Sequence, residues 1–306
     1  MLRLATFAPG LSRAGPGLLL RDIEKGEDAQ VAAAVAVIAA AHPDILLLTD
    51  FDWDNRGIAL AAFAARLKAA GLDFPHRFAP RPNSGMDTGL DIDGNGRGGE
   101  ARDAQGYGAF PGQHGMALLS RLPIEATTAR DFSALLWADL PGSQIEGAGR
   151  SEAARAVQRL STTGHWDVSV QLDATHTLQI WAMAATPPLF DGPEDRNGRR
   201  NRDETAFWLR YLDGDLPQRP GPAPFVLMGD LDLDPAQGEG RRDALTALLS
   251  DPRFQDPHPR RAGAAPGAPD AEATADFGGR SGPLRTDYIL PAAGLKVLAS
   301  GVLWPD

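Results

Sequence analysis

The run FVLMGDLDLDP at residues 225–235 constrains the fold of this chain more than any other stretch. Four apolar residues and a glycine precede carboxylates at every second position, Asp230, Asp232 and Asp234. Such a run is typical of a strand buried on both faces and ended by proline, and the three carboxylates would point the same way if the strand continued. Carboxylates this close need solvent, a cation or cationic side chains to coexist. A solvated, aspartate-rich turn after a core strand is the alternative interpretation.

The order of strand-like and helix-like segments predicts an α/β architecture. Helices are expected at 30–41 and 58–70, from about 203 to 212, and at 241–249. Strands are expected at 2–7, 44–50, 115–121, 166–172, 178–184, 225–231, 284–291 and 295–302, and a Pro-, Ala- and Gly-rich segment at 257–269 is expected to be mobile. Acidic residues at strand ends, Asp50 among them, predict a site at one edge of the sheet.

Composition limits the classes of protein to which the chain can belong. With 306 residues and 43% hydrophobic content, it can bury one large core, and nothing requires two domains. The absence of cysteine excludes disulfides and thiolate metal sites. The formal charge of −10 argues against strong non-specific binding to nucleic acid. Nearly all positive charge is arginine, which suits phosphate recognition but is also what coding bias would produce.

No apolar run approaches the roughly 20 residues needed to span a bilayer, so stable membrane insertion is not expected. The first residues, MLRLATF, are typical of a strand and not of an export signal. We therefore expect a cytoplasmic protein, or a secreted or periplasmic one if the chain is a processed form.

Two loops contain candidate binding residues. In the long loop 81–113, Asp91, Asp93 and Asn95 stand at positions one, three and five of a sequence that resembles the opening of a calcium-binding loop, with Gly96 at position six. The twelfth position is Arg102 instead of an acid, and a plain Asx/Gly turn is the alternative. The second loop leads into a helix and is suited to hold an anion through Arg196, Asn197, Arg199, Arg200 and Asn201. His114, just before a predicted strand, is a further candidate for the mouth of the site.

Taken in order, six segments resemble the endonuclease/exonuclease/phosphatase superfamily of metal-dependent phosphoesterases. They are ATF, LLLTDFDWD, GMALLSRLPI, ATPPLFDGPEDRNGRRN, GDLDLDP and RTDYILP. The DGNGR loop and the PPLFDGPEDRNGRRN segment are similar to those of a bacterial branch. The resemblance implies a four-layer α/β sandwich, with two mixed β-sheets packed face to face and helices outside, and one such domain over residues 1–306.

The chemistry that the resemblance implies is hydrolysis of phosphate mono- or diesters with Mg²⁺ or Mn²⁺ as cofactor, in addition to any Ca²⁺ in the 91–103 loop. Asp50, Asp230 and Asp232 would hold the metal, and Asp230, Asp232 and Asp287 would form the catalytic set. Arg196–Asn201 and His114 would contact the substrate. The acidic net charge favours a small phosphate ester or a phospholipid headgroup over large DNA.

Several family positions are substituted. Ala8 stands where the resemblance implies a metal-binding asparagine, Asp50 where it implies glutamate, Ala184 where it implies histidine, and Asp232 where it implies an amide. Asp287 matches the carboxylate that orients the catalytic histidine, but the closing Ser-Asp-His strand is absent from the sequence. We therefore expect a phosphoesterase with a degraded active site and weak or no standard activity. The alternatives are a pseudoenzyme that acts as a binding or scaffold module, and a truncated form of an active hydrolase.

Overall fold

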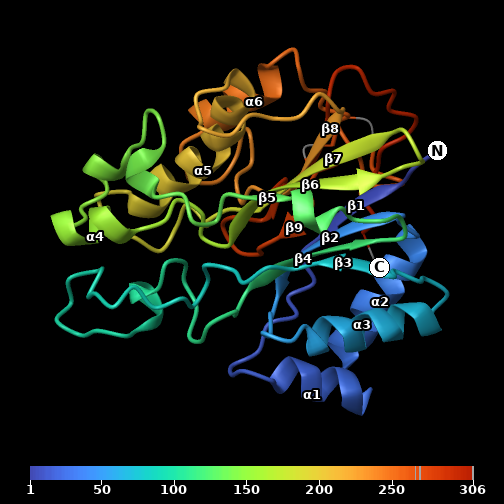
Figure 1. Cartoon of the computed structure of the whole chain (residues 1–306), viewed down its shortest axis with the longest axis horizontal. Helices are drawn as coiled ribbons and strands as arrows, with labels where there is room; N and C mark the ends of the chain where they lie inside the picture. The colour runs from blue at the N-terminus through green and yellow to red at the C-terminus, as the bar shows by residue number, and fades with distance from the viewer. Residues whose placement is uncertain (266, 269, 305–306) are drawn as a thin grey trace.

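Two mixed β-sheets packed face to face, with helices on their outer surfaces, form the structure (Figure 1). This computed structural model describes residues 1–265, 267–268 and 270–304. One sheet has the strand order β1-β2-β4-β3 and the other β11-β8-β7-β6-β5, while β9 and β10 form a separate two-stranded sheet. The first sheet contains β1 (Leu4–Phe7), β2 (Ile45–Phe51), β3 (His76–Phe78) and β4 (Gly115–Ser120). The second contains β5 (Arg130–Asp131), β6 (Gly164–Gln171), β7 (Thr177–Ala184), β8 (Phe225–Asp230) and β11 (Asp287–Pro291).

The centre of the sandwich is apolar because alternate residues of each strand face the other sheet. Ile45 and Leu47 of β2 pack with Val168 of β6 and Met228 of β8 in one buried cluster. Strands buried on both faces read as continuous apolar runs, which is why the segments around β2 and β8 were recognisable in the sequence. Both β1–β2 and β7–β8 pair in parallel, and the other neighbours in the two sheets are antiparallel. The predicted face-to-face arrangement of mixed sheets is confirmed.

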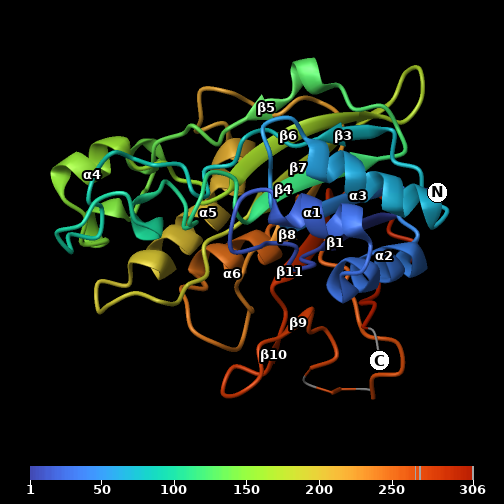
Figure 2. The same cartoon turned by 90° about the horizontal axis from the view of Figure 1, so that it is seen from below.

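Helices cover the outer face of each sheet (Figure 1). The face of β2 that carries Leu46 and Leu48 packs against α1 (Leu18–Lys25), α2 (Ala29–Ala41) and α3 (Ile58–Ala69). On the other side, Trp181 of β7 packs against α5 (Arg196–Asp213) and α6 (Asp243–Ser250). The short helix α4 (Glu152–Val157) lies at one end of the molecule, beside the long loop 81–113 (Figures 1 and 2).

The predicted strand at 295–302 is wrong. The structure gives this segment no place in either main sheet, and its backbone forms only an isolated bridge between Val302 and Arg261. A turn explains the difference: Leu295 donates its backbone N–H to Ala292, and Gln255 donates its side-chain amide to the carbonyl of Leu295. This turn directs the apolar segment away from the sheet edges.

Two other predicted elements differ from those in the structure. Helix α5 begins at Arg196, seven residues before the expected start, and the expected strand at 284–291 is divided between β10 (Pro283–Leu284) and β11. The hairpin partner of β10 is β9 (Ala275–Asp276), and both lie below the main sheets in Figure 2. Positions 266 and 269 of the segment expected to be mobile lie outside the described residues, as do positions 305 and 306.

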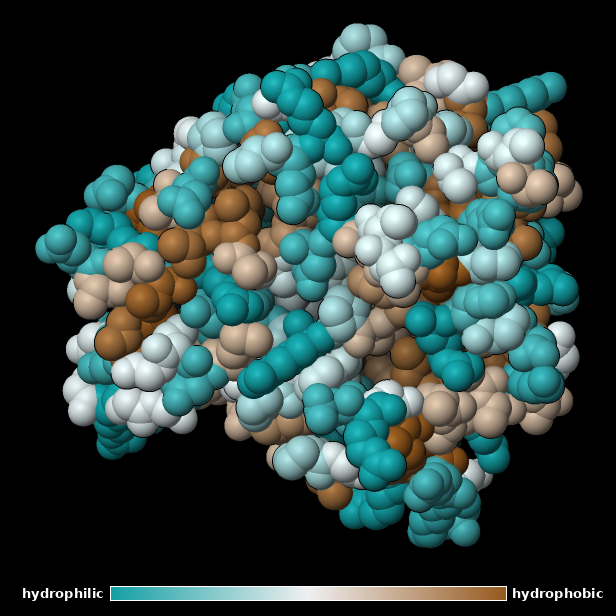
Figure 3. All heavy atoms as spheres, in the orientation of Figure 1, coloured by the Kyte–Doolittle hydropathy of each residue, from teal (hydrophilic) through white to brown (hydrophobic). Residues whose placement is uncertain are grey.

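Hydrophilic side chains cover much of the face shown in Figure 3 and surround smaller hydrophobic patches. Across the described ranges, none of the helices combines the length and the apolar character that a membrane crossing requires.

Candidate active site

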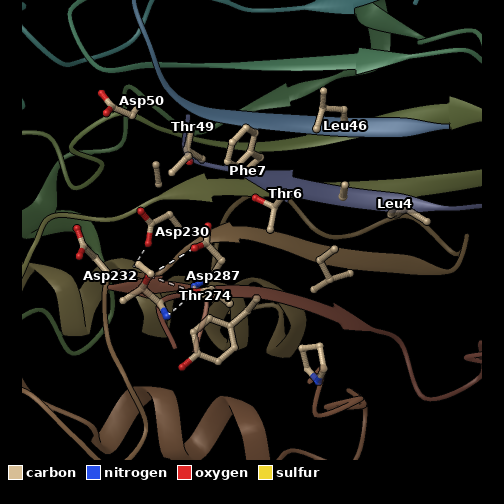
Figure 4. Close-up of a pocket in the computed structure, with 18 of the residues that line it drawn as sticks. Leu4, Thr6, Phe7, Leu46, Thr49, Asp50, Asp230, Asp232, Thr274 and Asp287 are labelled. Carbon is tan, nitrogen blue, oxygen red and sulfur yellow. Dashed lines mark hydrogen bonds between the residues drawn. The ribbon is translucent and has the colours of Figure 1, made fainter. Parts of the chain in front are cut away.

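Three carboxylates gather where β8 ends and β11 begins. The two strands are antiparallel, and their register places Asp287 directly beside Asp230. Asp232 follows two residues after Asp230 and donates its backbone N–H to the Oδ1 atom of Asp230 over 2.8 Å. Figure 4 shows the three side chains close together, with Thr274 beside Asp287. The strand pairing therefore assembles an acidic cluster from segments more than 50 residues apart in the sequence.

Local backbone geometry makes this assembly possible. Gly229 has a φ of 149°, and a Cβ atom at this position would lie 1.9 Å from the carbonyl oxygen of Met183 on β7. Only glycine lets β8 approach β7 this closely just before the acidic cluster. Asp232 has a φ of 52°, a left-handed conformation that is uncommon for residues other than glycine. β8 ends at Asp230, one residue before the predicted end of the strand, so the strand does not continue through Asp234.

Asp234 does not join the cluster. Its Oδ1 atom accepts hydrogen bonds from the backbone N–H groups of Ala236 and Gln237, and its Oδ2 atom accepts one from Arg285. These bonds give Asp234 a structural role, in which it closes the turn after β8 and joins it to the chain leading into β11.

Burial and mutual repulsion make the cluster electrostatically costly. Burial, followed by the charge of Asp287, raises the pKa of Asp232 to about 7, and burial raises the pKa of Asp287 to about 6. The pKa of Asp230 lies well above its usual range, because of burial first and then the charges of Asp232 and Asp287. The Oδ1 atom of Asp287 is buried and has no hydrogen-bond partner among the described residues. A bound cation would stabilise the ionised forms of all three groups.

Asp50 and His114 form a pair at the end of the other sheet. The pairing of β2 with β4 shifts register between Leu48 and Phe51, and this irregularity contains Asp50. Both residues have left-handed backbones, with φ of 53° at Asp50 and 56° at His114. The Nδ1 atom of His114 lies 2.5 Å from the Oδ1 atom of Asp50, and this hydrogen bond raises the pKa of His114. Bulges and strained residues of this kind are concentrated at functional sites.

A cleft of about 2250 Å³ connects the two sets of residues. Asp50, His114, Asp230, Asp232 and Asp287 all line it. In Figure 4, Asp50 follows Thr49 on one sheet, whereas Asp230, Asp232 and Asp287 lie across the gap on the other. Within the described residues, no three carboxylate or imidazole ligand atoms of this cleft lie within 4.8 Å of one another, so the oxygens of Asp230, Asp232 and Asp287 do not converge as tightly as those of the acidic loop.

The sequence profile of the Endonuclease/Exonuclease/phosphatase family matches residues 23–306. The chain belongs to this family. No curated protein sequence gives a significant match. The family resemblance predicted from the sequence is thus confirmed by a family match over nearly the whole chain.

Solved structures of low sequence identity share this family fold. An endonuclease/exonuclease/phosphatase from Beutenbergia cavernae has a TM-score of 0.58 at 17% identity, covering 97% of this chain and 66% of its own length. Sphingomyelinase C from Streptomyces griseocarneus has a TM-score of 0.54 at 17% identity, covering 98% of this chain and 86% of its own. The beta toxin of Staphylococcus aureus, in a mutant structure with bound magnesium ions, has a TM-score of 0.53 at 11% identity. The match covers 98% of this chain and 86% of the toxin chain. The chain therefore spans just under two thirds of the Beutenbergia protein.

Two positions at which the resemblance implies polar residues lie at the site. Ala8 and Ala184 both line the cleft that Asp230 and Asp287 line. Ala184 is the register partner of Asp230 across β7 and β8, so it lies directly beside the acidic cluster. A methyl group offers neither a metal ligand nor a hydrogen-bond donor at these two places.

The predicted anion-binding loop is only partly available to a ligand. Arg196, Asn197 and Arg200 line the cleft, whereas Arg199 and Asn201 do not. Asn201 is fully buried, and its amide donates to the carbonyl oxygens of Thr186 and Leu231, each over 2.8 Å. Arg199 donates from Nε to the carbonyl of Glu194 over 3.0 Å. The early start of α5 explains this, because helical geometry turns Asn201 toward the protein interior.

Sequence reasoning missed Glu204. This carboxylate is fully buried on α5 and accepts backbone hydrogen bonds from Thr162 over 2.5 Å and from Thr186 over 2.7 Å. Both threonines line the cleft, and burial raises the pKa of Glu204 to about 7. In the sequence, RNGRRNRDE looks like a solvated charged segment, and it has no apolar periodicity that would indicate the burial of Glu204.

The acidic loop assembles a different set from the predicted one. Ligand atoms of Asp91, Asp93 and Asp103 all lie within 4.8 Å of one another. The Asn95 side chain instead donates its amide to Asp93 and Glu100. Asp91 also accepts backbone hydrogen bonds from Gly94, Asn95 and Gly96, and that from Gly96 is the main reason that its pKa is lowered. These bonds are also those of an Asx turn, so the geometry is compatible with both interpretations of the loop.

Proposed function

We propose that this protein is a metal-dependent phosphate-ester hydrolase with slow turnover, whose centre is Asp230, Asp232 and Asp287. One observation carries the proposal: three half-buried carboxylates with raised pKa values meet at adjacent strand ends and open into a large cleft. A cluster of this kind is unfavourable for stability, and perturbed carboxylates in a cleft are typical of functional sites.

The donor chemistry of the acidic cluster suits Mg²⁺ or Mn²⁺, and one ion would draw together three carboxylates whose ligand atoms do not all lie within 4.8 Å of one another. The donors of the cluster are carboxylate oxygens, which hard divalent cations prefer, and the buried Oδ1 atom of Asp287 has no partner among the described residues. Asp230, Asp232 and Asp287 would hold the ion, with Asp50 across the cleft as a further ligand. A divalent cation at such a site polarises a phosphoryl oxygen and lowers the pKa of bound water. The magnesium ions in the beta toxin structure support this choice by analogy only.

Other residues of the cleft would orient the substrate. His114, hydrogen-bonded to Asp50, lines the cleft, and this hydrogen bond raises the pKa of its imidazole and so favours the protonated form. Arg196, Asn197 and Arg200 line the same cleft and supply hydrogen-bond donors suited to phosphoryl oxygens. Asp232, in contrast, would repel a phosphate group unless it is protonated or bound to metal.

Slow turnover follows from the missing donors. Removing one preorganised donor from an active site typically costs about 10²–10³ in rate. Ala8 and Ala184 lack the side-chain donors that the family resemblance implies, and the unpartnered oxygen of Asp287 is where an oriented histidine would bind. The rate losses for the separate donors are not additive and cannot be multiplied, so we expect only that the activity lies far below that of a complete site.

We further propose that the substrate is a small phosphate ester or a phospholipid headgroup. The net charge of −10 disfavours a long polyanion, whereas a single phosphate group needs only local positive charge. The chain as a whole is proposed to fold as one domain, which a single cooperative unfolding transition would support.

Hydrolysis assays test the proposed function. Bis-p-nitrophenyl phosphate and p-nitrophenyl phosphate would be incubated with the protein and Mg²⁺, Mn²⁺ or Ca²⁺, with EDTA as the metal-free control. Turnover should require metal and should disappear in Asp230→Ala, while Asp73→Asn, which changes an exposed carboxylate paired with Lys68, should behave as wild type. Equal rates in wild type and Asp230→Ala would refute the proposal.

A binding module without turnover is the second candidate. The observation that favours it is the same unpartnered Oδ1 atom of Asp287, together with alanine at 184 beside the cluster. This candidate predicts metal-dependent binding of phosphate compounds and no hydrolysis above the Asp230→Ala background. Robust EDTA-sensitive hydrolysis would exclude it.

We infer that the acidic loop would bind Ca²⁺ if it binds a cation, through Asp91, Asp93 and Asp103. The support is the convergence of their oxygens within 4.8 Å. Calorimetric titration with Ca²⁺ should show heat in wild type that is lost in Asp93→Asn and retained in Asp230→Ala. No difference between Asp93→Asn and wild type would favour the plain Asx turn.

A further inference from the structure

Three arginine side chains, Arg150, Arg196 and Arg200, line one wall of the cleft. Arg150 comes just before α4, whereas Arg196 and Arg200 lie one turn apart in the first part of α5. The fold thus brings together guanidinium groups from segments about 50 residues apart in the sequence. The chain has a net charge of −10, so a group of one buried and two half-buried arginine side chains needs an explanation.

Two of these groups contain buried donors without a partner. The Nε atoms of Arg150 and Arg196 are buried, and neither has a hydrogen-bond partner among the described residues. Arg150 donates through Nη1 to the carbonyl of Ile92 over 2.9 Å, and Arg196 contacts Glu194 through Nη2 over 2.7 Å. A buried guanidinium donor that makes no hydrogen bond costs free energy, so a ligand that accepts from it would be favoured.

Arg200 is held rigidly in place. Its side chain is only 6% exposed, and it donates to the backbone carbonyls of Leu160, Gln105 and Arg159 over 2.6–3.0 Å. Neutral carbonyls fix the orientation of the guanidinium but do not cancel its charge. Its position on the wall is therefore preorganised, which is what an anion-binding group requires.

Carboxylates balance the positive charges only in part: the charges of Asp93 and Glu194 act on Arg150, and that of Glu204 acts on Arg200. Burial, and then the charges of Arg196 and Arg200, lower the pKa of Arg150 to about 9. Glu194 pairs with Arg196, but neither Arg150 nor Arg200 has a carboxylate within ion-pair distance among the described residues. An oxyanion would supply acceptors for the unpartnered donors of Arg150 and Arg196 and further negative charge beside Arg150 and Arg200.

We propose that Arg150, Arg196 and Arg200 form a binding subsite for a phosphate-type oxyanion, apart from the acidic cluster. The planar donor groups of arginine suit the oxygens of a phosphate monoester or a pyrophosphate. Binding at this subsite requires neither the metal nor hydrolysis. That the bound group belongs to the substrate rests on the proposed function, and it would then fix the ester in the cleft while the reacting group faces the carboxylates.

Calorimetry in EDTA would test the subsite without involving the metal centre. Inorganic phosphate and pyrophosphate would be titrated into wild type, Arg150→Gln, Arg196→Gln and Arg150→Lys. Arg155→Gln is the matched control, because Arg155 lies five residues from Arg150, pairs with Glu146 over 3.0 Å and does not line the cleft. Thermal unfolding of each variant would show that it is folded, and Arg196→Gln provides a second probe if Arg150→Gln is not.

We expect Arg150→Gln and Arg196→Gln to raise the Kd about tenfold or more, since hydrogen bonds to charged groups are among the strong ones. The Kd of Arg150→Lys should lie between those of these variants and wild type, and the Kd of Arg155→Gln should match that of wild type. Asp230→Asn should not weaken binding. No measurable binding to wild type, or equal binding by wild type, Arg150→Gln and Arg196→Gln, would overturn the proposal.

The same variants separate this subsite from the proposed hydrolysis. Loss of phosphate binding in Arg150→Gln together with no turnover in wild type would support the subsite and refute the enzyme. Metal-dependent turnover that is unchanged in Arg150→Gln and Arg196→Gln would support the enzyme and overturn the claim that the anion bound at this subsite belongs to the substrate.

Discussion

Replacing Asp232 by asparagine should stabilise the metal-free protein. The substitution keeps the shape of the side chain and removes one of three mutually repelling charges. Burial and Asp287 raise the pKa of Asp232 to about 7, so its ionised form destabilises the folded state. The unfolded chain loses this proton near pH 4, whereas the folded chain retains it until about pH 7. The cost therefore grows as the pH rises from 4 to 7 and is complete above 7.

The magnitude follows from the size of the pKa shift. Three pKa units correspond to about 4 kcal/mol at most, because each unit is worth roughly 1.4 kcal/mol. Asp232 is partly exposed and shares its repulsion with Asp230 and Asp287. We therefore expect Asp232→Asn to raise the free energy of unfolding by about half of this maximum, or about 2 kcal/mol. For a chain of this length, that raises the melting temperature by about 3 °C.

Calorimetric or fluorescence melts in EDTA at pH 4 and pH 8 would measure this. Asp232→Asn should melt above wild type at pH 8 and level with it at pH 4, and the exposed control Asp73→Asn should show neither effect. Adding Mg²⁺ should reverse the order, because wild type would gain about 2.7 kcal/mol at a concentration one hundred times its Kd. If Asp232→Asn melted below wild type in EDTA at pH 8, repulsion among the three carboxylates would not be the dominant effect.

Three further substitutions test the frame of the site. Glu204→Gln should lower the free energy of unfolding by about 2 kcal/mol, because an amide nitrogen would face the backbone N–H of Thr162 or Thr186. Denaturant unfolding curves that coincide for Glu204→Gln and wild type would refute this. Gly229→Ala should cost about 3 kcal/mol or more, or prevent folding, because its Cβ would lie 1.9 Å from the oxygen of Met183; a soluble variant that melts like wild type would contradict the packing. His165 is fully buried, and burial lowers its pKa to about 4. As the pH falls, the unfolded chain therefore takes up this proton before the folded chain does, so the free energy of unfolding should fall by up to about 3 kcal/mol between pH 6.5 and 4. In acid titrations followed by circular dichroism, His165→Gln should lose less stability over this pH range than wild type.

The sequence could predict the parts of the fold that obey simple hydrophobic patterns. The strands around Leu47 and Met228 are buried on both faces, and their continuous apolar runs located β2 and β8. The same runs end near Asp50 and Asp230, which located two of the candidate ligands. Asp287 was found through the family motif alone, because the strand containing it is short and pairs with β8 from a distant segment.

The sequence misled where polar residues are buried and where an apolar segment is not in a sheet. The first part of α5 carries Arg200, Asn201 and Glu204 on a buried face, so hydrophobic periodicity did not reveal that the helix begins at Arg196. The apolar residues at 295–302 resemble a strand, but pairing with a sheet edge depends on the direction of the preceding turn. Arg150 was missed for a related reason: nothing near it in the sequence indicates that it will meet the arginines of α5.

The proposed function depends on a divalent cation bound at Asp230, Asp232 and Asp287. Anomalous diffraction from crystals soaked with Mn²⁺ and phosphate would locate such an ion. We expect a manganese peak in contact with oxygens of Asp230 and Asp287 in wild type, and its loss in Asp230→Asn. A fully soaked crystal with no peak at this cluster, or with manganese only at the 91–103 loop, would contradict it.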